Sequence, residues 1–199
     1  MGKVALRVSL FSLALGGLCP KSVSAAVAYL QGAYATPQTP QTTVQVTFAA
    51  AQKIGSLNVV IVGWNDTTNI VSSVKDSQGN TYQLAVGPIK QSTVLSQSIY
   101  YAKNIAGGSN AVTVTFSGAA TYPDIRILEY SGIDPNNPVD VVVAAAGSSS
   151  TTNSGSVTTT NAADLLVGAN TVVTLTSGPA AVIRSACARV RTATSLRIG

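Results

Sequence analysis

The side chains that could support catalysis are few and widely spaced. The chain has no histidine, which excludes Ser-His-Asp and Cys-His nucleophiles and His-ligated zinc. Glu129 is the one glutamate, and the aspartates stand mostly beside Gly, Asn or Pro, as they do in turns. Because a glycosidase needs two carboxylates that face each other across a sugar, we predict that the protein is not an enzyme and rank a glycan hydrolase last.

Oxygen-rich turns offer metal chemistry instead. Asp134, Asn136 and Asp140 crowd one turn-like stretch and are the candidate calcium ligands. Calcium takes about six to eight oxygens, which is more than a single turn supplies. Side chains that cap their own turns are the favoured alternative. We therefore expect no cofactor, with calcium as the open alternative.

Aromatic side chains are the remaining candidates for binding. Trp64, Tyr82 and Tyr122 could form a platform on which a sugar stacks, since flat rings with a polar rim suit pyranose faces. The alternative is a role in the core, because Trp64 is the last residue of an apolar segment that we expect to be a buried strand. For most of the aromatic residues the core role is favoured.

Glu129 is unusual because of the strand that carries it. Alternation places Ile125, Ile127 and Glu129 on one face of 125–130, and Arg126, Leu128 and Tyr130 on the other. One reading is a buried carboxylate tuned for chemistry. The favoured reading is a strand-end carboxylate that reaches solvent or pairs with a nearby lysine.

The elements that must position these residues are strands. Thr43–Phe48 and Ala111–Phe116 alternate strictly, and Leu57–Trp64 is almost continuously apolar, as a strand covered on both sides would be. No window of ten or more residues has a helical period. The other candidate strands are 71–75, 81–86, 97–103, 125–130, 139–144, 156–160 and 165–169. Short strands separated by Gly, Pro and Asn predict an all-β, jelly-roll-like antiparallel β-sandwich.

The connections predict particular turns. Val74–Tyr82 reads as a hairpin in which Asp76 caps the turn and Gly79 or Asn80 takes a positive φ. Gly132–Asp140 is a double-proline turn that no regular element can cross. We assign the Ser/Thr-rich run that follows to the same domain.

The N-terminus reads as a secretory signal. Lys3 and Arg7 precede an apolar run from Val8 to Leu18, and small residues end at Ala25. A membrane anchor is the alternative, but about eleven apolar residues fall short of the roughly twenty that span a bilayer. We expect 1–25 to be a signal peptide, the domain 26–180 to be exported, and no segment to span a membrane.

Charge excludes one class of partner. From Val27 to Ile183 the chain has five basic and seven acidic residues, so its net charge is 5 − 7 = −2. The basic sequence pI of about 9.4 arises at the two ends of the chain. Nucleic-acid binding needs clustered Lys and Arg on a folded face. We therefore expect no nucleic-acid partner.

A family resemblance is carried by four segments: "SLNVVIVGWNDTTNIVSSVKDSQGNTY", "SQSIYYAKNI", "PDIRILEYSGIDPNNPVD" and "NAADLLVGA". Together they resemble a widespread, largely uncharacterised secreted β-sandwich module of bacteria, found beside fibronectin-III-like or immunoglobulin-like repeats in surface proteins. The resemblance covers roughly Tyr29 to Pro179. It implies a fold and an extracellular setting, and it brings no catalytic residues.

The end of the chain departs from that family, whose members continue with a segment like PDGDIAEDR. Plausible codons for Ala193 to Gly199, read two bases later, encode Asp-Ile-Ala-Glu-Asp-Arg. We hypothesise that 181–199 is this acidic segment read out of frame; the alternative is a genuine basic tail. We expect the tail to be unfolded. We also expect the sandwich to lack its last strand or strands, with a bare edge beside Leu165–Ala169.

These observations combine into one functional expectation. We predict a non-catalytic extracellular module, structural or adhesive, of a bacterial secreted or surface protein. A carbohydrate-binding module is the alternative. The expected partners are surface glycans or other extracellular proteins.

Overall fold

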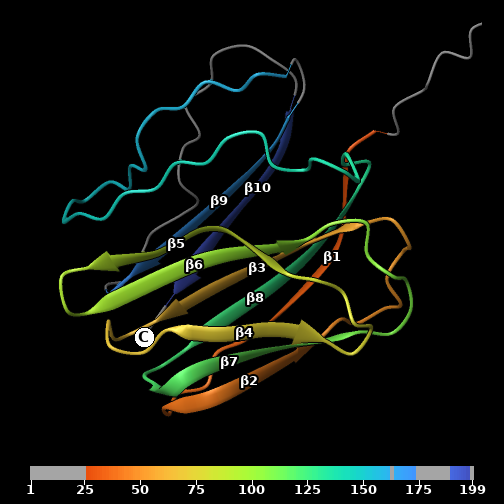
Figure 1. Cartoon of the computed structure of the whole chain (residues 1–199). Coiled ribbons are helices and arrows are strands. Elements are labelled where there is room, and N and C mark those ends of the chain that lie inside the picture. Colours follow the sequence, from red (N-terminus) through yellow and green to blue (C-terminus); the bar gives the residue numbers. More distant parts are fainter. Residues whose placement is uncertain (1–25, 162–163, 174–188, 198–199) are drawn as a thin grey trace, which may run out of the picture.

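The computed structural model describes residues 26–161, 164–173 and 189–197, and over these ranges the protein is all-β with no helix (Figure 1). The predicted signal peptide lies outside them. No helix in the described ranges has the length and apolar character that a bilayer crossing requires. The strands are β1 (Ala28–Ala35), β2 (Gln41–Thr47), β3 (Leu57–Trp64), β4 (Val71–Asp76), β5 (Gln83–Gln91), β6 (Leu95–Ala102), β7 (Ala111–Ala120), β8 (Asp124–Ser131), β9 (Asp164–Val172) and β10 (Arg189–Arg197).

Two antiparallel sheets pack face to face as a β-sandwich, which confirms the predicted fold class (Figure 1). One sheet has the order β1-β8-β3-β6-β5 and the other the order β2-β7-β4. The chain passes from one sheet to the other at each of the first four strands. The narrower expectation, a jelly roll, stays a prediction.

The main core lies between the two sheets. The alternating residues of β2 and β7 all point into it, as predicted, and β3 and β8 supply the facing side chains. Its buried members are Val44, Val46, Phe48, Val60, Val62, Trp64, Val112, Val114, Phe116, Ala120, Ile125 and Ile127. Burial of such side chains contributes about 1.5–3 kcal/mol each, so this layer supplies the main stabilisation of the domain.

A second apolar layer covers the outer face of the five-stranded sheet. Leu57, Val59 and Ile61 of β3 belong to it, and Leu165 and Val167 of β9 pack against it. All eight residues of β3 are buried. The continuous apolar sequence of β3 therefore reflects cover on both faces, as predicted.

The C-terminal segment differs from the expectation of an unfolded tail and a bare edge. Strand β10 pairs with β9 in parallel, from Arg189 opposite Asp164 to Arg197 opposite Val172 (Figure 1). The segment alternates β-branched residues with others, a pattern that favours a strand. The edge of β9 that we expected to be open is paired in this structure.

Two predicted strands, 139–144 and 156–160, are wrong: neither segment is a strand in the structure. Figure 1 shows 134–161 as a long loop that runs out and returns. Side chains rather than a backbone ladder join its two arms, because the carboxylate of Asp140 accepts hydrogen bonds from the backbone and hydroxyl of Thr160. Val139, Val142, Val143 and Val157 of this loop are exposed, so their β propensity did not lead to pairing with a sheet.

The turn after β4 has the predicted geometry. Asp76 Oδ1 accepts hydrogen bonds from the backbone N–H of Gln78 at 3.2 Å and of Asn80 at 2.9 Å. Gly79 has a φ of +76°, and a Cβ there would meet nothing within 4 Å. The glycine is needed for its backbone conformation and not for space.

Replacing Gly79 with valine should therefore destabilise the domain by about 1–3 kcal/mol, because a β-branched residue is strained at this φ. Thermal unfolding followed by circular dichroism measures the effect, with Gly147→Val as the control, since Gly147 has open space and no positive φ. An unchanged melting temperature for Gly79→Val would contradict the turn assignment.

Candidate functional site

The predicted calcium ligands serve separate parts of the long loop. Asp134 Oδ1 accepts hydrogen bonds from the backbone N–H of Asn136 at 2.7 Å and of Asn137 at 3.2 Å, and these bonds lower the pKa of Asp134. The carbonyl of Asn136 accepts a hydrogen bond from the ammonium of Lys103. Asp140 is bonded to Thr160. Within the described residues no three Asp, Glu, Cys or His side chains gather as metal ligands.

The predicted aromatic platform requires a correction, because its three members lie in different environments. Trp64 is 0 % exposed. Its ring meets Phe116 edge-on at 5.6 Å and its Nε1 donates to the carbonyl of Asn69. Tyr82 is half-buried and hydrogen-bonded inside the domain. Tyr122 alone of the three is counted among the exposed large side chains. A buried indole offers no face to a ligand, so the core alternative holds for Trp64.

Tyr82 belongs to a buried polar network at one end of the sandwich. Asp76 Oδ2 accepts from the hydroxyl of Tyr82 at 3.0 Å and from the amide of Asn110 at 2.8 Å. Gln52 links Asn110 at 2.7 Å to Asn58 at 2.6 Å. Burial raises the pKa of Tyr82, and the nearby Asp76 carboxylate raises it further. The network joins the β2–β3 loop, β3, the end of β4 and the residue before β7. These polar groups therefore stabilise the fold.

Hydrogen bonds set the charge state of Asp76. Burial by itself would raise the pKa of Asp76. The hydrogen bonds from Asn110, Asn80 and Tyr82 outweigh burial and lower the pKa below its ordinary value. Asp66 behaves alike, because bonds from Asn69, Thr121 and other donors outweigh burial. Both carboxylates are held ionised by their own loops.

Glu129 is 1 % exposed, so the expectation that it reaches solvent is wrong. Its Oε2 accepts from the side-chain amide of Gln31 at 2.7 Å, and its Oε1 accepts from the backbone N–H of Lys53 at 2.8 Å. Gln31 also exchanges two hydrogen bonds of 3.0 Å with the backbone of Ala50. Glu129 therefore fastens the β2–β3 loop to β1 and β8.

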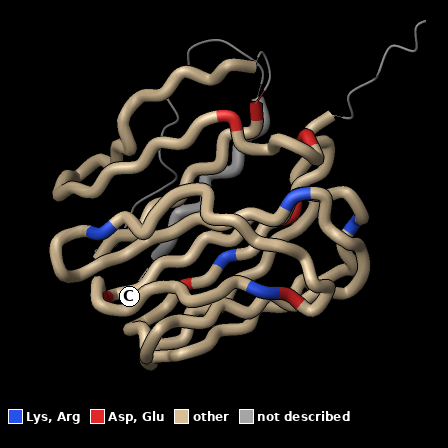
Figure 2. Tube along the Cα trace, viewed as in Figure 1, with Lys and Arg blue, Asp and Glu red and all other residues tan. Residues whose placement is uncertain are grey.

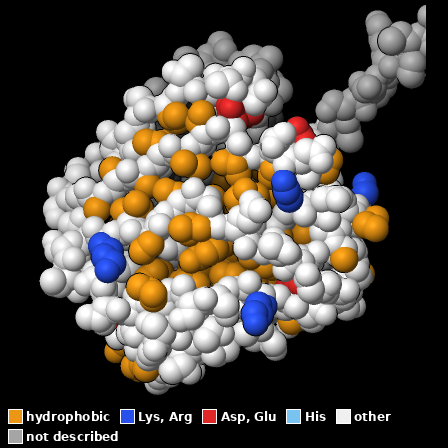
Figure 3. All heavy atoms as spheres, viewed as in Figure 1, with side chains coloured by type: hydrophobic (Ala, Val, Ile, Leu, Met, Phe, Trp, Pro, Cys, Tyr) orange, Lys and Arg blue, Asp and Glu red, His pale blue; other side chains and the backbone are white. Residues whose placement is uncertain are grey.

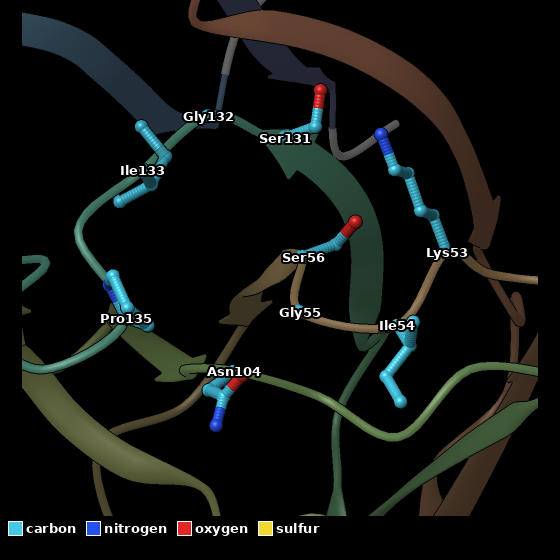
Figure 4. Close-up of a pocket in the computed structure, with 9 residues that line it drawn as sticks. All are labelled: Lys53, Ile54, Gly55, Ser56, Asn104, Ser131, Gly132, Ile133 and Pro135. Carbon is cyan, nitrogen blue, oxygen red and sulfur yellow. The ribbon is translucent and has the colours of Figure 1, made fainter. Parts of the chain in front are cut away.

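One cavity, of about 280 Å³, lies next to this loop at the end of β8 (Figure 4). In Figure 4 the Lys53 side chain extends towards Ser131, while Ile54 points away from both. The cavity is lined by Lys53, Ile54, Gly55, Ser56, Asn104, Ser131, Gly132, Ile133 and Pro135, which include no carboxylate. A lining of one ammonium, hydroxyls and an amide has no acid–base pair for hydrolysis.

A second, smaller cavity of about 160 Å³ lies on the outer face of β1 and β8, and sequence reasoning missed it. Tyr29, Gly32 and Tyr34 of β1 line it together with Arg126 and Leu128 of β8. We call this surface the tyrosine groove. Tyr29 is 47 % exposed and Tyr34 is 67 % exposed. The alternation of Gly32 and Tyr34 along β1 is the signal that could have revealed it.

Neighbouring groups hold the tyrosine groove in place. Tyr29 packs edge-on against Tyr130, with ring centroids 5.7 Å apart. The guanidinium of Arg126 lies 5.2 Å from the centre of the Tyr34 ring. Arg126 in turn donates from Nε and Nη2 to the two carboxylate oxygens of Asp124, both at 3.1 Å. A bidentate pair of this kind fixes the guanidinium plane.

Asp124 carries the negative charge of that pair under the surface. Burial raises the pKa of Asp124, and the hydrogen bond and charge of Arg126 offset part of this effect. The side chains of Arg126 and Asp124 are 18 % and 2 % exposed. The tyrosine groove is therefore close to neutral overall, with the cation nearer the solvent.

The outer surface shows no concentration of charge in the views drawn. In Figure 2 the lysines and arginines drawn in blue lie apart from one another. Figure 3 shows hydrophobic side chains gathered across the middle of the same face, with single cations around them. A clustered basic face, which nucleic-acid binding requires, is not seen in this view.

Comparisons of the chain with protein-family models, with curated proteins and with solved structures find no match.

Proposed function

We propose that the protein is a non-catalytic extracellular module, of adhesive or structural type, in a bacterial secreted or surface protein. The signal-like start of the chain supports the location, and the β-sandwich suits a module that works outside the cell. The absence of histidine from the sequence supports the non-catalytic part.

One observation carries this proposal: the polar groups of the domain are used to hold its loops, while tyrosines are left exposed on an edge strand. Asp66, Asp76 and Glu129 each accept several internal hydrogen bonds. Tyr29 and Tyr34, in contrast, are exposed on β1. Tyrosine gives rigid, amphipathic contact area at a low cost in side-chain entropy, which suits adhesion.

Adhesion can be measured with beads that carry the purified protein. Coated beads should attach to bacterial cells in flow, and Tyr34→Ala should reduce the attachment to the level of bare beads, because the exposed ring is lost. Leu84→Ala is the matched control, since Leu84 is 48 % exposed on β5 at the opposite edge of the same sheet. Attachment that is absent, or that Tyr34→Ala leaves unchanged, would overturn the adhesive function and leave only the structural one.

A further inference from the structure

We infer that the tyrosine groove binds a neutral saccharide, with sugar rings stacked on Tyr29 and Tyr34 and sugar hydroxyls bound by Arg126. This inference rests on the proposed adhesive function and names the class of ligand. It moves the carbohydrate-binding role from the residues expected from the sequence to a different surface.

Gly32 sets the shape of the tyrosine groove beneath Tyr29. A Cβ on Gly32 would lie 2.9 Å from the carbonyl oxygen of Ile127 and 2.9 Å from the hydroxyl of Tyr29. Gly32 is thus the residue type that leaves β1 close to β8 and lets Tyr29 lie over the strand. The Tyr29 hydroxyl therefore lies over Gly32, and Tyr34 lies two residues further along the same face of β1, so a flat ligand can lie across the two side chains.

The polar group of the tyrosine groove is preorganised. The bonds to Asp124 use Nε and Nη2 of Arg126, which leaves the two N–H groups of Nη1 outside the pair. A fixed guanidinium loses little freedom when it donates further hydrogen bonds. The hydroxyls of Tyr29 and Tyr34 add groups that can donate and accept. Sugar hydroxyls need such donors and acceptors around an aromatic face.

Charge favours a neutral ligand over an acidic one. The cation of Arg126 is compensated by Asp124 at 3.1 Å. The part of the chain after the predicted signal peptide, 26–199, has nine basic and seven acidic residues, so its net charge is only 9 − 7 = +2. An anionic polymer gains little from a compensated cation and a small net charge, whereas a neutral saccharide needs no uncompensated charge.

Native affinity electrophoresis tests the inference, because weak binding to a polysaccharide in the gel retards the protein. The full chain is run in gels that contain neutral glucan, xylan, mannan or galactan, or the acidic polymer polygalacturonate. We expect retardation by at least one neutral polymer. We expect Tyr34→Ala to weaken the apparent affinity about tenfold, as loss of an aromatic contact does, and Tyr34→Phe to retain most of it.

Leu84→Ala should be retarded as strongly as the unmodified protein, and circular dichroism confirms that each variant is folded. Retardation by polygalacturonate alone, equal retardation of Tyr34→Ala, or no retardation by any neutral polymer would overturn the inference. If coated beads still attach to cells in those cases, the adhesive function stands and only the ligand class fails. If retardation occurs but the beads do not attach, the adhesive function fails.

Discussion

Replacing Trp64 with alanine should cost about 3–5 kcal/mol of folding free energy, the usual effect of removing a buried aromatic side chain. The indole is 0 % exposed and packs on Phe116 in the core between the sheets. Its Nε1 also donates to the carbonyl of Asn69 at 3.2 Å, and the alanine variant loses this hydrogen bond. The free energy of unfolding of a small domain is about 5–15 kcal/mol in total. Much of the variant protein should therefore be unfolded at moderate temperatures.

Urea unfolding followed by circular dichroism measures this change. Tyr122→Ala is the control, because Tyr122 is exposed and its removal should change the free energy of unfolding by no more than about 0.5 kcal/mol. A loss below about 1 kcal/mol for Trp64→Ala would show that Trp64 is not a core residue. It would return Trp64 to the set of binding candidates.

Replacing Asp76 with alanine should be the most damaging change among the carboxylates, at about 3 kcal/mol. Hydrogen bonds to a charged group contribute about 1.5–3 kcal/mol, and a buried donor left unpaired costs about 1–3 kcal/mol. The variant leaves Asn110, which is 2 % exposed, and Tyr82 without their shared acceptor. It also removes the side-chain cap of the turn that holds Gly79.

The same residue predicts how stability depends on pH. The folded pKa of Asp76 lies below its ordinary value of 3.8. The stabilisation is therefore complete above that ordinary value and is lost as the pH falls through the folded pKa. Unfolding curves of Asp76→Ala should depend less on pH in acid than those of the unmodified protein. Asp134→Ala, in an exposed turn, should be close to the unmodified protein at neutral pH; equal losses for the two variants would refute the network.

Periodicity predicted the sandwich because side-chain alternation is a local property that burial preserves. Val44, Val46 and Phe48 needed only an apolar face to pack on, and β7 supplied it. The same logic put Ile127 and Leu128 on opposite faces of their strand, and in the structure Ile127 lies in the main core and Leu128 in the outer layer. The glycine of the β4 turn was also predictable, since its positive φ follows from the few residues around it.

Features that depend on distant partners were not predictable in this way. Segment 139–144 is β-branched and apolar, yet a strand forms only where another strand offers a free edge. Glu129 is buried because Gln31 and the backbone of Lys53, far away in sequence, supply two donors. Charge and alternation alone could not reveal those donors.

The tyrosine groove was missed for a related reason. Tyr29 and Tyr34 lie in β1, which is not among the strands predicted from the sequence, and the register of β1 with β8 depends on the folded sheet. The pairing of Tyr34 with Arg126 is what puts a guanidinium beside the ring. Candidate aromatics chosen from the sequence included Trp64, whose strand is covered on both faces. A binding surface of this kind needs the register as well as the residue types.

The central claim is that the protein binds a saccharide without cleaving it. The most direct test uses one neutral polysaccharide that retards the protein in the gel. The insoluble form of that polymer is incubated with the protein, and protein depletion from solution and release of reducing ends are measured in the same tube. The account predicts depletion that Tyr34→Ala strongly reduces, with reducing ends at the level of the protein-free sample. Reducing ends that rise with protein concentration, and fall in Asp66→Asn or Asp124→Asn, would contradict it.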